Sequence, residues 1–351
     1  MSTILTRPID NIKIVTFGCW NNVKIRAGRM PMVDVISNIK SKESTYTDLV
    51  LLGDNYYPQG KTKKKIGDKE VKLIKYDCVE YQTGFRLVED LQIPNKYLIM
   101  GNHEIEDTLT NPDLPCVGLL EQMRNPLFRV MFPFGSEIKS VGTTTYKYIF
   151  IDTTVYSLDG KPNTCFDKML GKSATEIKNE QNTFLARELA DDSINHFIIF
   201  GHQPLISIKS KTDTFTEEIK GKSEILLELT NIIMNSRKSI YYVCADVHMY
   251  QSGTIEDSSG HKITQIVCGT GGAEKDYYCQ GERNITVDSY TFKIDNHVDS
   301  YGYVEMTLSS IGIDWVYKKV IQKIKVDDSD VVIQTDIEVK SFHRKYLINY
   351  S

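Results

Sequence analysis

The sequence has no apolar run long enough to cross a membrane and no strong excess of either charge. Its longest purely apolar stretches, such as residues 197–200, fall far short of the roughly 18 residues that a transmembrane helix needs. The 42 lysines and arginines nearly balance the 46 aspartates and glutamates, which gives a net charge of −4. With 41% hydrophobic residues, this balance is typical of a globular protein and argues against a disordered or nucleic-acid-coating chain.

Targeting and disulfide signals are also scarce. The first residues lack a charged segment followed by an apolar one, so we expect no secretion signal. Seven scattered cysteines, an odd number, favour reduced thiols over a disulfide framework. We therefore expect an intracellular protein with no membrane span. The 20 tyrosines, with abundant lysine, isoleucine and asparagine, hint at an AT-rich genome such as that of a protist or a large DNA virus.

Short apolar runs rich in β-branched residues recur along the chain and predict buried strands. They occupy residues 12–17, 49–52, 97–100, 146–151, 197–200, 240–244, 263–268 and 303–308. Helical periodicity lies between several of them, at residues 33–39, 80–91, 175–189 and 224–234. This alternation predicts an α/β protein. The strands that follow one another after about residue 240 predict an antiparallel end to a mixed sheet system.

No linker rich in proline, glycine or serine divides the chain. We expect one main domain over residues 1–325 and a C-terminal extension of unknown role over residues 326–351. The segment 58–75 stands out because seven lysines against two acidic residues give it a charge of +5. We expect an inserted surface loop. Two interpretations of it stay open: a solvated loop, or a loop at the mouth of an active site that attracts an anionic substrate.

Four of the predicted strands end in short loops rich in side chains that bind metals. The loops are Gly53-Asp54-Asn55-Tyr56-Tyr57, Gly101-Asn102-His103-Glu104, Gly201-His202-Gln203-Pro204 and Ala245-Asp246-Val247-His248. Loops at the carboxyl ends of strands are where α/β proteins build their sites. Carboxylate, amide, imidazole and phenol groups together suit Fe, Mn or Zn better than Ca or Mg. The pattern predicts a site in which Asp54 bridges two metal ions and a phosphate ester is hydrolysed.

The order of these loops resembles that of the calcineurin-like metallophosphoesterases, in particular the purple acid phosphatase branch. The motifs GDNxY, GNHE and GHxP occur in the family's order, and an altered last motif reads xDxH. Gly18-Cys19-Trp20 stands at the place of the first motif, and the match runs from about residue 12 to about residue 320. The resemblance implies two packed mixed β-sheets flanked by helices, in a four-layer sandwich.

The resemblance also implies a role for each motif residue. It puts Asp54 between the two metals, Tyr57 and His248 on the first metal, and Asn102 and His202 on the second. His103 is then the histidine that contacts the phosphate or protonates the leaving group, and Glu104 orients its imidazole. The implied cofactors are two metal ions, Fe, Zn or Mn. The implied substrate is a phosphorylated small molecule or a phosphoprotein, and the sequence carries no nucleic-acid signature.

Two positions depart from the family's ligand set. Cys19 stands where the first motif offers an aspartate, and Asp246 stands where the last motif offers a histidine. Both residues stay candidate ligands, because a thiolate and a carboxylate bind divalent metals. A histidine expected shortly after the GHxP motif is missing, although Lys209 or Lys211 could supply its charge.

These departures leave two functions open. The first is a metal-dependent phosphoesterase with an altered metal preference, acting on a phosphomonoester or phosphoanhydride. The second is a catalytically inactive phosphatase-like protein that serves as a binding or structural component, with a protein assembly as its partner. The retained motif residues favour the enzyme, and the replacements at Cys19 and Asp246 favour the inactive protein.

Overall fold

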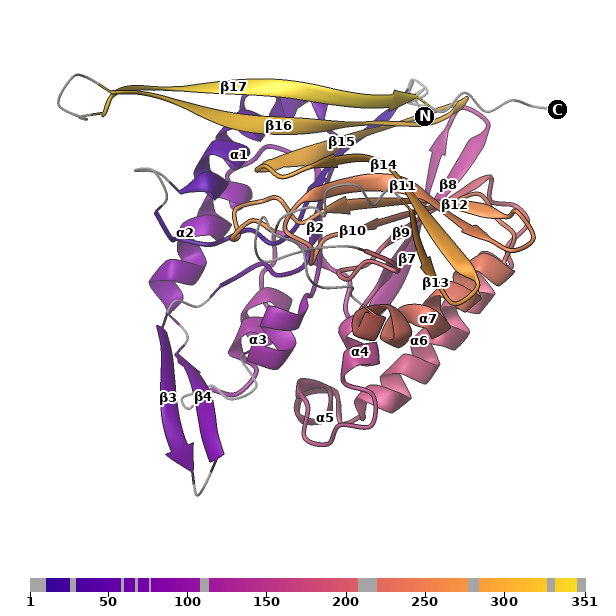
Figure 1. Ribbon diagram of the computed structural model, residues 1–351, viewed down its shortest axis with the longest axis horizontal. Coiled ribbons are helices and arrows are strands. Elements are labelled where there is room, and N and C mark those ends of the chain that lie inside the picture. The colour runs from indigo at the N-terminus through magenta and orange to yellow at the C-terminus, as the bar shows by residue number, and fades with distance from the viewer. Residues whose placement is uncertain are drawn as a thin grey trace, which may run out of the picture.

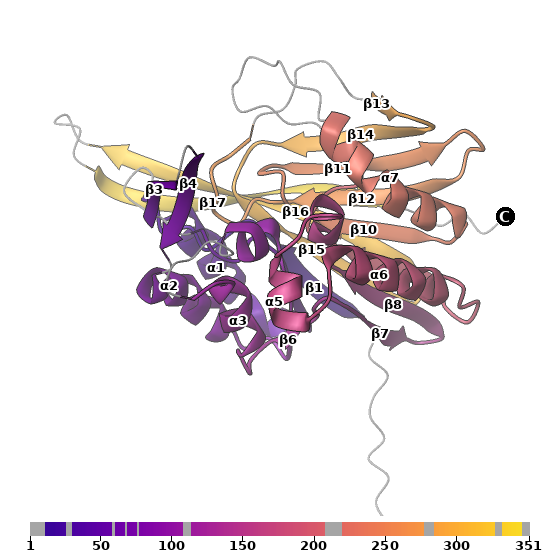
Figure 2. The ribbon, with the colours of Figure 1, turned by 90° about the horizontal axis from the view of Figure 1, so that it is seen from below.

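Two mixed β-sheets pack against each other, and helices lie on their outer sides (Figures 1 and 2). The computed structural model describes residues 11–25, 30–57, 60–66, 69–75, 77–107, 114–207, 220–276, 284–326 and 332–345. The predicted α/β class with two packed mixed sheets is confirmed.

The first sheet has seven strands in the order β17-β16-β15-β1-β2-β5-β6. Its parallel strands are β1 (Ile12–Phe17), β2 (Asp48–Leu52), β5 (Asn95–Ile99) and β6 (Arg129–Val130). The antiparallel strands β15 (Gly302–Ser309), β16 (Gly312–Val326) and β17 (Val332–Lys345) extend the sheet beyond β1. Because β1, β2 and β5 are parallel neighbours, their carboxyl ends meet at one edge.

The second sheet has eight strands in the order β13-β14-β11-β12-β10-β9-β8-β7. Its parallel strands are β8 (Thr144–Ile151), β9 (His196–Phe200), β10 (Ile240–Cys244) and β12 (Lys262–Cys268). Its antiparallel strands are β7 (Phe134–Val141), β11 (Tyr250–Asp257), β13 (Asn284–Val287) and β14 (Tyr290–Val298). The described chain after β10 holds strands but no helix, and these strands pair antiparallel, as predicted, except that β12 lies parallel to β10.

The helices fall into two groups, one beside each sheet (Figure 2). Beside the first sheet lie α1 (Pro31–Lys40), α2 (Cys78–Glu89) and α3 (Val117–Met123), with the short turns η1 (Glu43–Thr45) and η2 (His103–Asp107). Beside the second lie α4 (Thr154–Ser157), α5 (Cys165–Leu170), α6 (Ala174–Leu189) and α7 (Lys220–Asn235). All the predicted strands and helices are present.

The central strands are buried on both faces. Every residue of β2, β9 and β10 is buried, so these strands appear in the sequence as continuous apolar runs rather than as alternating patterns. Aromatic rings join the two sheets, since Tyr97 of β5 stacks on Phe150 of β8 with ring centroids 5.2 Å apart. This rigid double sheet fixes the positions of the loops at the strand ends.

The lysine-rich segment is not the loop that its composition predicts. Residues Gly60–Ile66 and Lys69–Lys75 form β3 and β4, which pair antiparallel from Gly60 opposite Lys75 to Ile66 opposite Lys69. The hairpin projects from the body of the protein beyond α2 (Figure 1). Lysine is uncommon in strands, so the local composition favoured a loop, whereas cross-strand pairing stabilises the hairpin.

The described part of the C-terminal extension forms an edge strand. Strand β17 pairs along β16 and is the outer strand of the first sheet. The division at residue 325 stays a prediction.

The expectation that all cysteines are reduced is wrong for two of them. Cys116 and Cys165 form a disulfide between the starts of α3 and α5, with their Cα atoms 5.7 Å apart. The two residues are separated by 49 positions, and only the packing of the two helices brings them together. The free cysteines in the described chain are Cys19, Cys78, Cys244 and Cys268, and Cys279 lies outside it.

Among the described helices, none has the length and apolar character of a membrane span.

Candidate metal centre

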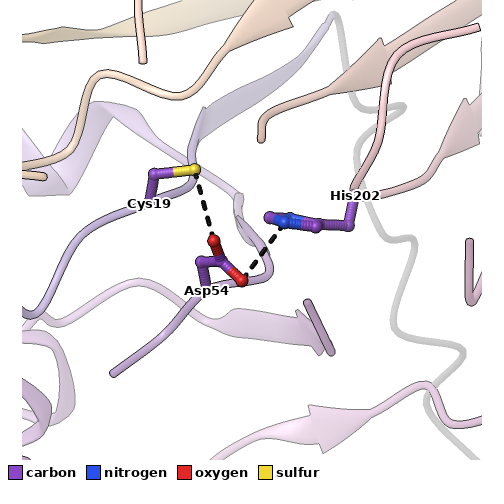
Figure 3. A group of neighbouring side chains, drawn as sticks. All are labelled: Cys19, Asp54 and His202. Carbon is purple, nitrogen blue, oxygen red and sulfur yellow. Dashed lines mark hydrogen bonds and ion pairs between the residues drawn. The ribbon is translucent and has the colours of Figure 1, made fainter. Parts of the chain in front are cut away.

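The polar loops after β1, β2, β5, β9 and β10 meet where the two sheets adjoin. Figure 3 shows Cys19, Asp54 and His202 directed toward one another, and one ligand atom of each lies within 4.8 Å of the other two. Close backbone approach makes this possible, because a Cβ atom at Gly18 would lie 2.5 Å from the Cβ atom of Ala245. Loops from both sheets therefore build a single buried cluster.

Each carboxylate oxygen of Asp54 faces a different group of side chains. Its Oδ2 accepts a hydrogen bond from the Tyr57 hydroxyl at 3.0 Å and lies 4.0 Å from Cys19 Sγ. The same hydroxyl lies 3.2 Å from His248 Nε2. The other carboxylate oxygen, Asp54 Oδ1, lies 3.2 Å from His202 Nε2. Asp54 thus stands between two sets of potential ligands.

The second set gathers around His202. His202 Nε2 lies 3.2 Å from Asn102 Oδ1 and 3.9 Å from Asp246 Oδ1. The structure therefore brings Asp246 to the Asn102 side of Asp54, whereas Cys19 lies on the Tyr57 side. All seven metal-ligand candidates of the sequence analysis lie in this one cluster.

The two histidines proposed as ligands are oriented as metal-binding histidines are. His202 Nδ1 donates to the carbonyl oxygen of Leu52 at 2.7 Å, and His248 Nδ1 donates to the carbonyl oxygen of Glu274. A carbonyl partner holds the proton on Nδ1 and leaves Nε2 as the electron-pair donor toward the centre. This second hydrogen bond is the usual support of a histidine ligand, so the residues present fit divalent metal ions.

Three of the candidate ligands have a left-handed backbone conformation. The φ angles are 51° at Cys19, 50° at Asp54 and 55° at Asp246. Residues other than glycine rarely adopt this conformation, and it concentrates at functional sites because the surrounding structure must hold it. The sharp turn directly after each strand directs the side chain into the cluster.

Glu104 holds the loops after β2 and β5 together. Its carboxylate accepts hydrogen bonds from the backbone N–H groups of Gly101, Asp54, Asn55 and Tyr56 at 2.7–3.2 Å. Burial, with the nearby charge of Asp54, raises the pKa of Glu104 to about 7. A role for Glu104 in orienting the imidazole of His103 stays a prediction.

His103 lies at the solvent side of the cluster. Its backbone N–H donates to Asp54 Oδ1 at 3.0 Å, and its Nε2 lies 3.8 Å from Asp54 Oδ2. The ring packs against Tyr57 with centroids 4.5 Å apart, and the side chain is 21% exposed, whereas Asp54 and His202 are buried. The imidazole can therefore meet a substrate that enters from solvent.

The charges of Asp54 and His202 shift each other's pKa in opposite directions. Burial alone would raise the pKa of Asp54, but His202 and His103 outweigh it and hold the pKa well below its usual range. Burial alone would lower the pKa of His202, yet the charge of Asp54 raises it to about 9. Burial, with the charges of Asp54 and Asp246, raises the pKa of the Cys19 thiol. A bound metal reverses this last effect, because a coordinating thiol loses its proton.

Sequence reasoning missed residues that support the cluster. Asp276 accepts a hydrogen bond from the backbone N–H of His248 at 2.9 Å, and nothing in its spacing from the motifs indicates this contact. Asn55 accepts from Trp20 Nε1 and donates to the carbonyl oxygen of Ile99, both at 2.8 Å, and so ties three strand ends together. Its place in the GDN motif was a usable signal. Lys209 and Lys211 lie outside the described residues.

Comparison with solved structures identifies the fold. Over 93% of this chain and 88% of the other, it is similar to "GAP50 the anchor in the inner membrane complex of Plasmodium", with a TM-score of 0.55 and 15% identity. Over 98% of this chain and 73% of the other, it is similar to PhoD, with a TM-score of 0.56 and 11% identity. Neither protein-family models nor curated proteins match the sequence.

The class that the fold defines is therefore the calcineurin-like metallophosphoesterase fold, which both neighbours share. The resemblance inferred from the strand-end motifs is confirmed at the level of the fold. At 11–15% identity, the likeness does not extend to activity.

Proposed function

We propose that the protein is a metal-dependent phosphoesterase that hydrolyses a phosphomonoester or a phosphoanhydride through two metal ions. The observation that carries the proposal is the position of Asp54, whose two carboxylate oxygens face separate sets of ligand side chains. A carboxylate placed in this way bridges the metals of two-metal hydrolases. The proposed substrate is a phosphorylated small molecule or a phosphoprotein.

Each metal would have four protein ligands. Cys19, Asp54, Tyr57 and His248 would hold the first, and Asp54, Asn102, His202 and Asp246 would hold the second. The mixed oxygen, nitrogen and sulfur set suits Fe, Zn or Mn. When bound, two such ions supply charge stabilisation of the phosphoryl group and a water of lowered pKa.

His103 is the proposed proton donor to the leaving group. It reaches the cluster from the solvent side, and its Nε2 lies 3.8 Å from Asp54 Oδ2, so a phosphate held at the cluster would be within its reach. General acid catalysis of this kind contributes about 10²- to 10⁴-fold in rate. Glu104 supports the reaction indirectly, since its hydrogen bonds hold the backbone around Asp54 and Gly101.

A second candidate is a catalytically inactive protein that acts as a binding or structural component. The observation that favours it is the replacement of two family ligands by Cys19 and Asp246, one on each side of Asp54. The description of GAP50 as an anchor gives this candidate a precedent on the same fold. Its partner would be another protein of an assembly.

The proposed location is inside a cell, and the disulfide restricts which compartment fits. The pair Cys116–Cys165 argues against the reducing cytosol, because disulfides persist in oxidising compartments. An oxidising compartment would account for the disulfide, whereas the sequence predicts no secretion signal and reduced thiols.

Hydrolysis of an aryl phosphate with added Mn²⁺, Zn²⁺ or Fe tests the proposal. The wild type should turn over, and Asp54→Asn should lose activity by at least about 10³-fold because the bridging charge is gone. Asp192→Asn is the matched control, since this aspartate is 94% exposed and lies outside the cluster, where it pairs with Lys238. Activity that survives Asp54→Asn would contradict the mechanism. Wild-type protein that binds two metals without turnover would favour the second candidate.

A further inference from the structure

A cavity of about 270 Å³ shares none of its lining residues with the candidate metal centre. The start of α1, the segment after β12, the turn between β14 and β15, and β16 form its walls. Its charged and aromatic lining residues are Asp34, Lys275, Asp299, Tyr301 and Lys319.

One chain segment belongs to both the cavity and the metal centre. The backbone N–H of Ala273 donates to the carbonyl oxygen of Cys19 at 2.9 Å. Asp276 exchanges two hydrogen bonds with the backbone of His248, one through its carboxylate and one through its N–H. Lys275 lies directly before Asp276 and faces the cavity. A molecule in the cavity would therefore contact the segment that holds Cys19 and His248.

The cavity contains charges of both signs that lack partners. In the described chain, the ammonium groups of Lys275 and Lys319 take part in no ion pair or hydrogen bond, although Lys275 Nζ lies 5.9 Å above the ring centre of Tyr301. Asp299 also lines the cavity, and among the described residues its buried Oδ1 has no hydrogen-bond partner. This carboxylate therefore lacks the compensation that a donor with a positive charge would supply.

We propose that this cavity binds a small zwitterion. The anionic group of the ligand lies against Lys275 and Lys319, and its ammonium group donates to Asp299. A simple anion would face the carboxylates of Asp34 and Asp299, and a simple cation would face two lysines, so neither matches the lining. Tyr301 supplies an apolar surface for a short aliphatic spacer. The proposal goes beyond the phosphoesterase function and does not depend on it.

The test uses taurine, 2-aminoethanesulfonate, as the probe, because a sulfonate binds metals weakly. Ethanesulfonate lacks the amine and ethylamine lacks the sulfonate, so they are matched controls. Calorimetric titration of the full chain, freed of metal by a chelator, should show 1:1 binding of taurine at least about tenfold tighter than either control. The same result is expected with metal present.

Substitutions of the lining residues test whether taurine binds in this cavity. Lys275→Ala and Lys319→Ala should each weaken taurine binding about tenfold, and Asp299→Asn should weaken taurine but not ethanesulfonate. Lys161→Ala, at an exposed lysine outside the cavity, should change nothing. Equal thermal unfolding of all the variants would show that each is folded.

Two results would overturn the proposal. Ethanesulfonate binding as tightly as taurine would show that the amine contributes nothing, and taurine binding that the cavity variants do not alter would place the ligand elsewhere. Because no turnover is measured, an inactive protein leaves this test intact.

Discussion

Replacing Cys19 by aspartate tests whether this position binds metal. Cys19 Sγ lies 4.0 Å from Asp54 Oδ2, and the side chain is fully buried. The left-handed backbone at Cys19, with φ of 51°, suits aspartate, which adopts this conformation more readily than most residues. The variant therefore adds a carboxylate to the cluster without adding backbone strain.

The added charge has opposite effects without and with metal. Two like unit charges about 4 Å apart repel by about 4 kcal/mol at an effective dielectric constant of about 20. Metal-free Cys19→Asp should therefore lose up to about 4 kcal/mol of unfolding free energy, less what protonation relieves. With metal, the carboxylate is a ligand and the repulsion becomes attraction. The metal-induced stabilisation should thus be larger in the variant than in the wild type.

Thermal unfolding of the full chain after chelation, and after adding Mn²⁺ or Zn²⁺, measures this difference. A free metal concentration of 1,000 times the Kd raises the free energy of unfolding by about 4 kcal/mol if only the folded protein binds the metal. Cys78→Asp is the control, because Cys78 is exposed at the start of α2 and should leave the metal-induced shift unchanged. Equal metal-induced shifts in wild type and Cys19→Asp would refute the assignment of Cys19 to the metal centre.

Three further predictions use other parts of the structure. If Tyr57 binds ferric iron, the iron-loaded protein should be coloured by phenolate-to-metal charge transfer, and Tyr57→Phe should bleach it; colourless iron-loaded wild type would exclude the role. Changing the four lysines of β3 to glutamine should lower kcat/KM more at 0.1 M than at 1 M salt, since the Debye length falls from about 10 Å to about 3 Å. Equal losses of kcat/KM at both salt concentrations would show that the hairpin does not attract the substrate. Glu188 lies 2.8 Å from Lys147 Nζ; burial alone would raise its pKa, but Lys147 and its other hydrogen-bond partners outweigh it and lower the pKa below the usual 4.5. Its stabilisation is therefore present above pH 4.5 and is lost as pH falls through the lowered pKa. Glu188→Gln should lose about 2 kcal/mol by urea unfolding at pH 7 and less at pH 3, and equal losses would contradict the ion pair.

The parts of the fold next to the site were predictable from the sequence. Strands such as β2 and β9 are buried on both faces and stand out as short apolar runs, and the loops after them carry their motifs in order. The sequence therefore predicted the candidate ligands Asp54, His202 and His248. It could not predict the distances between them, because these depend on how the two sheets pack.

Other features had no local signal. Strand β7 is only partly buried and mixes polar and apolar residues, so it has neither an apolar run nor a clean alternation. The hairpin of β3 and β4 depends on cross-strand pairing, and the disulfide of Cys116 and Cys165 depends on the packing of α3 and α5. Contacts of this kind join distant residues and leave no periodic trace in the sequence.

The central claim is that Asp54 bridges two metal ions, and the metal content of the protein tests it most directly. Protein purified without chelator, or reloaded with Mn²⁺ or Zn²⁺ and dialysed, should contain two metal ions per chain by elemental analysis. Asp54→Asn should retain at most one, because each metal loses a shared ligand and the charge between them. Metal-free wild type after reloading, or an Asp54→Asn variant that keeps two ions per chain, would contradict the account.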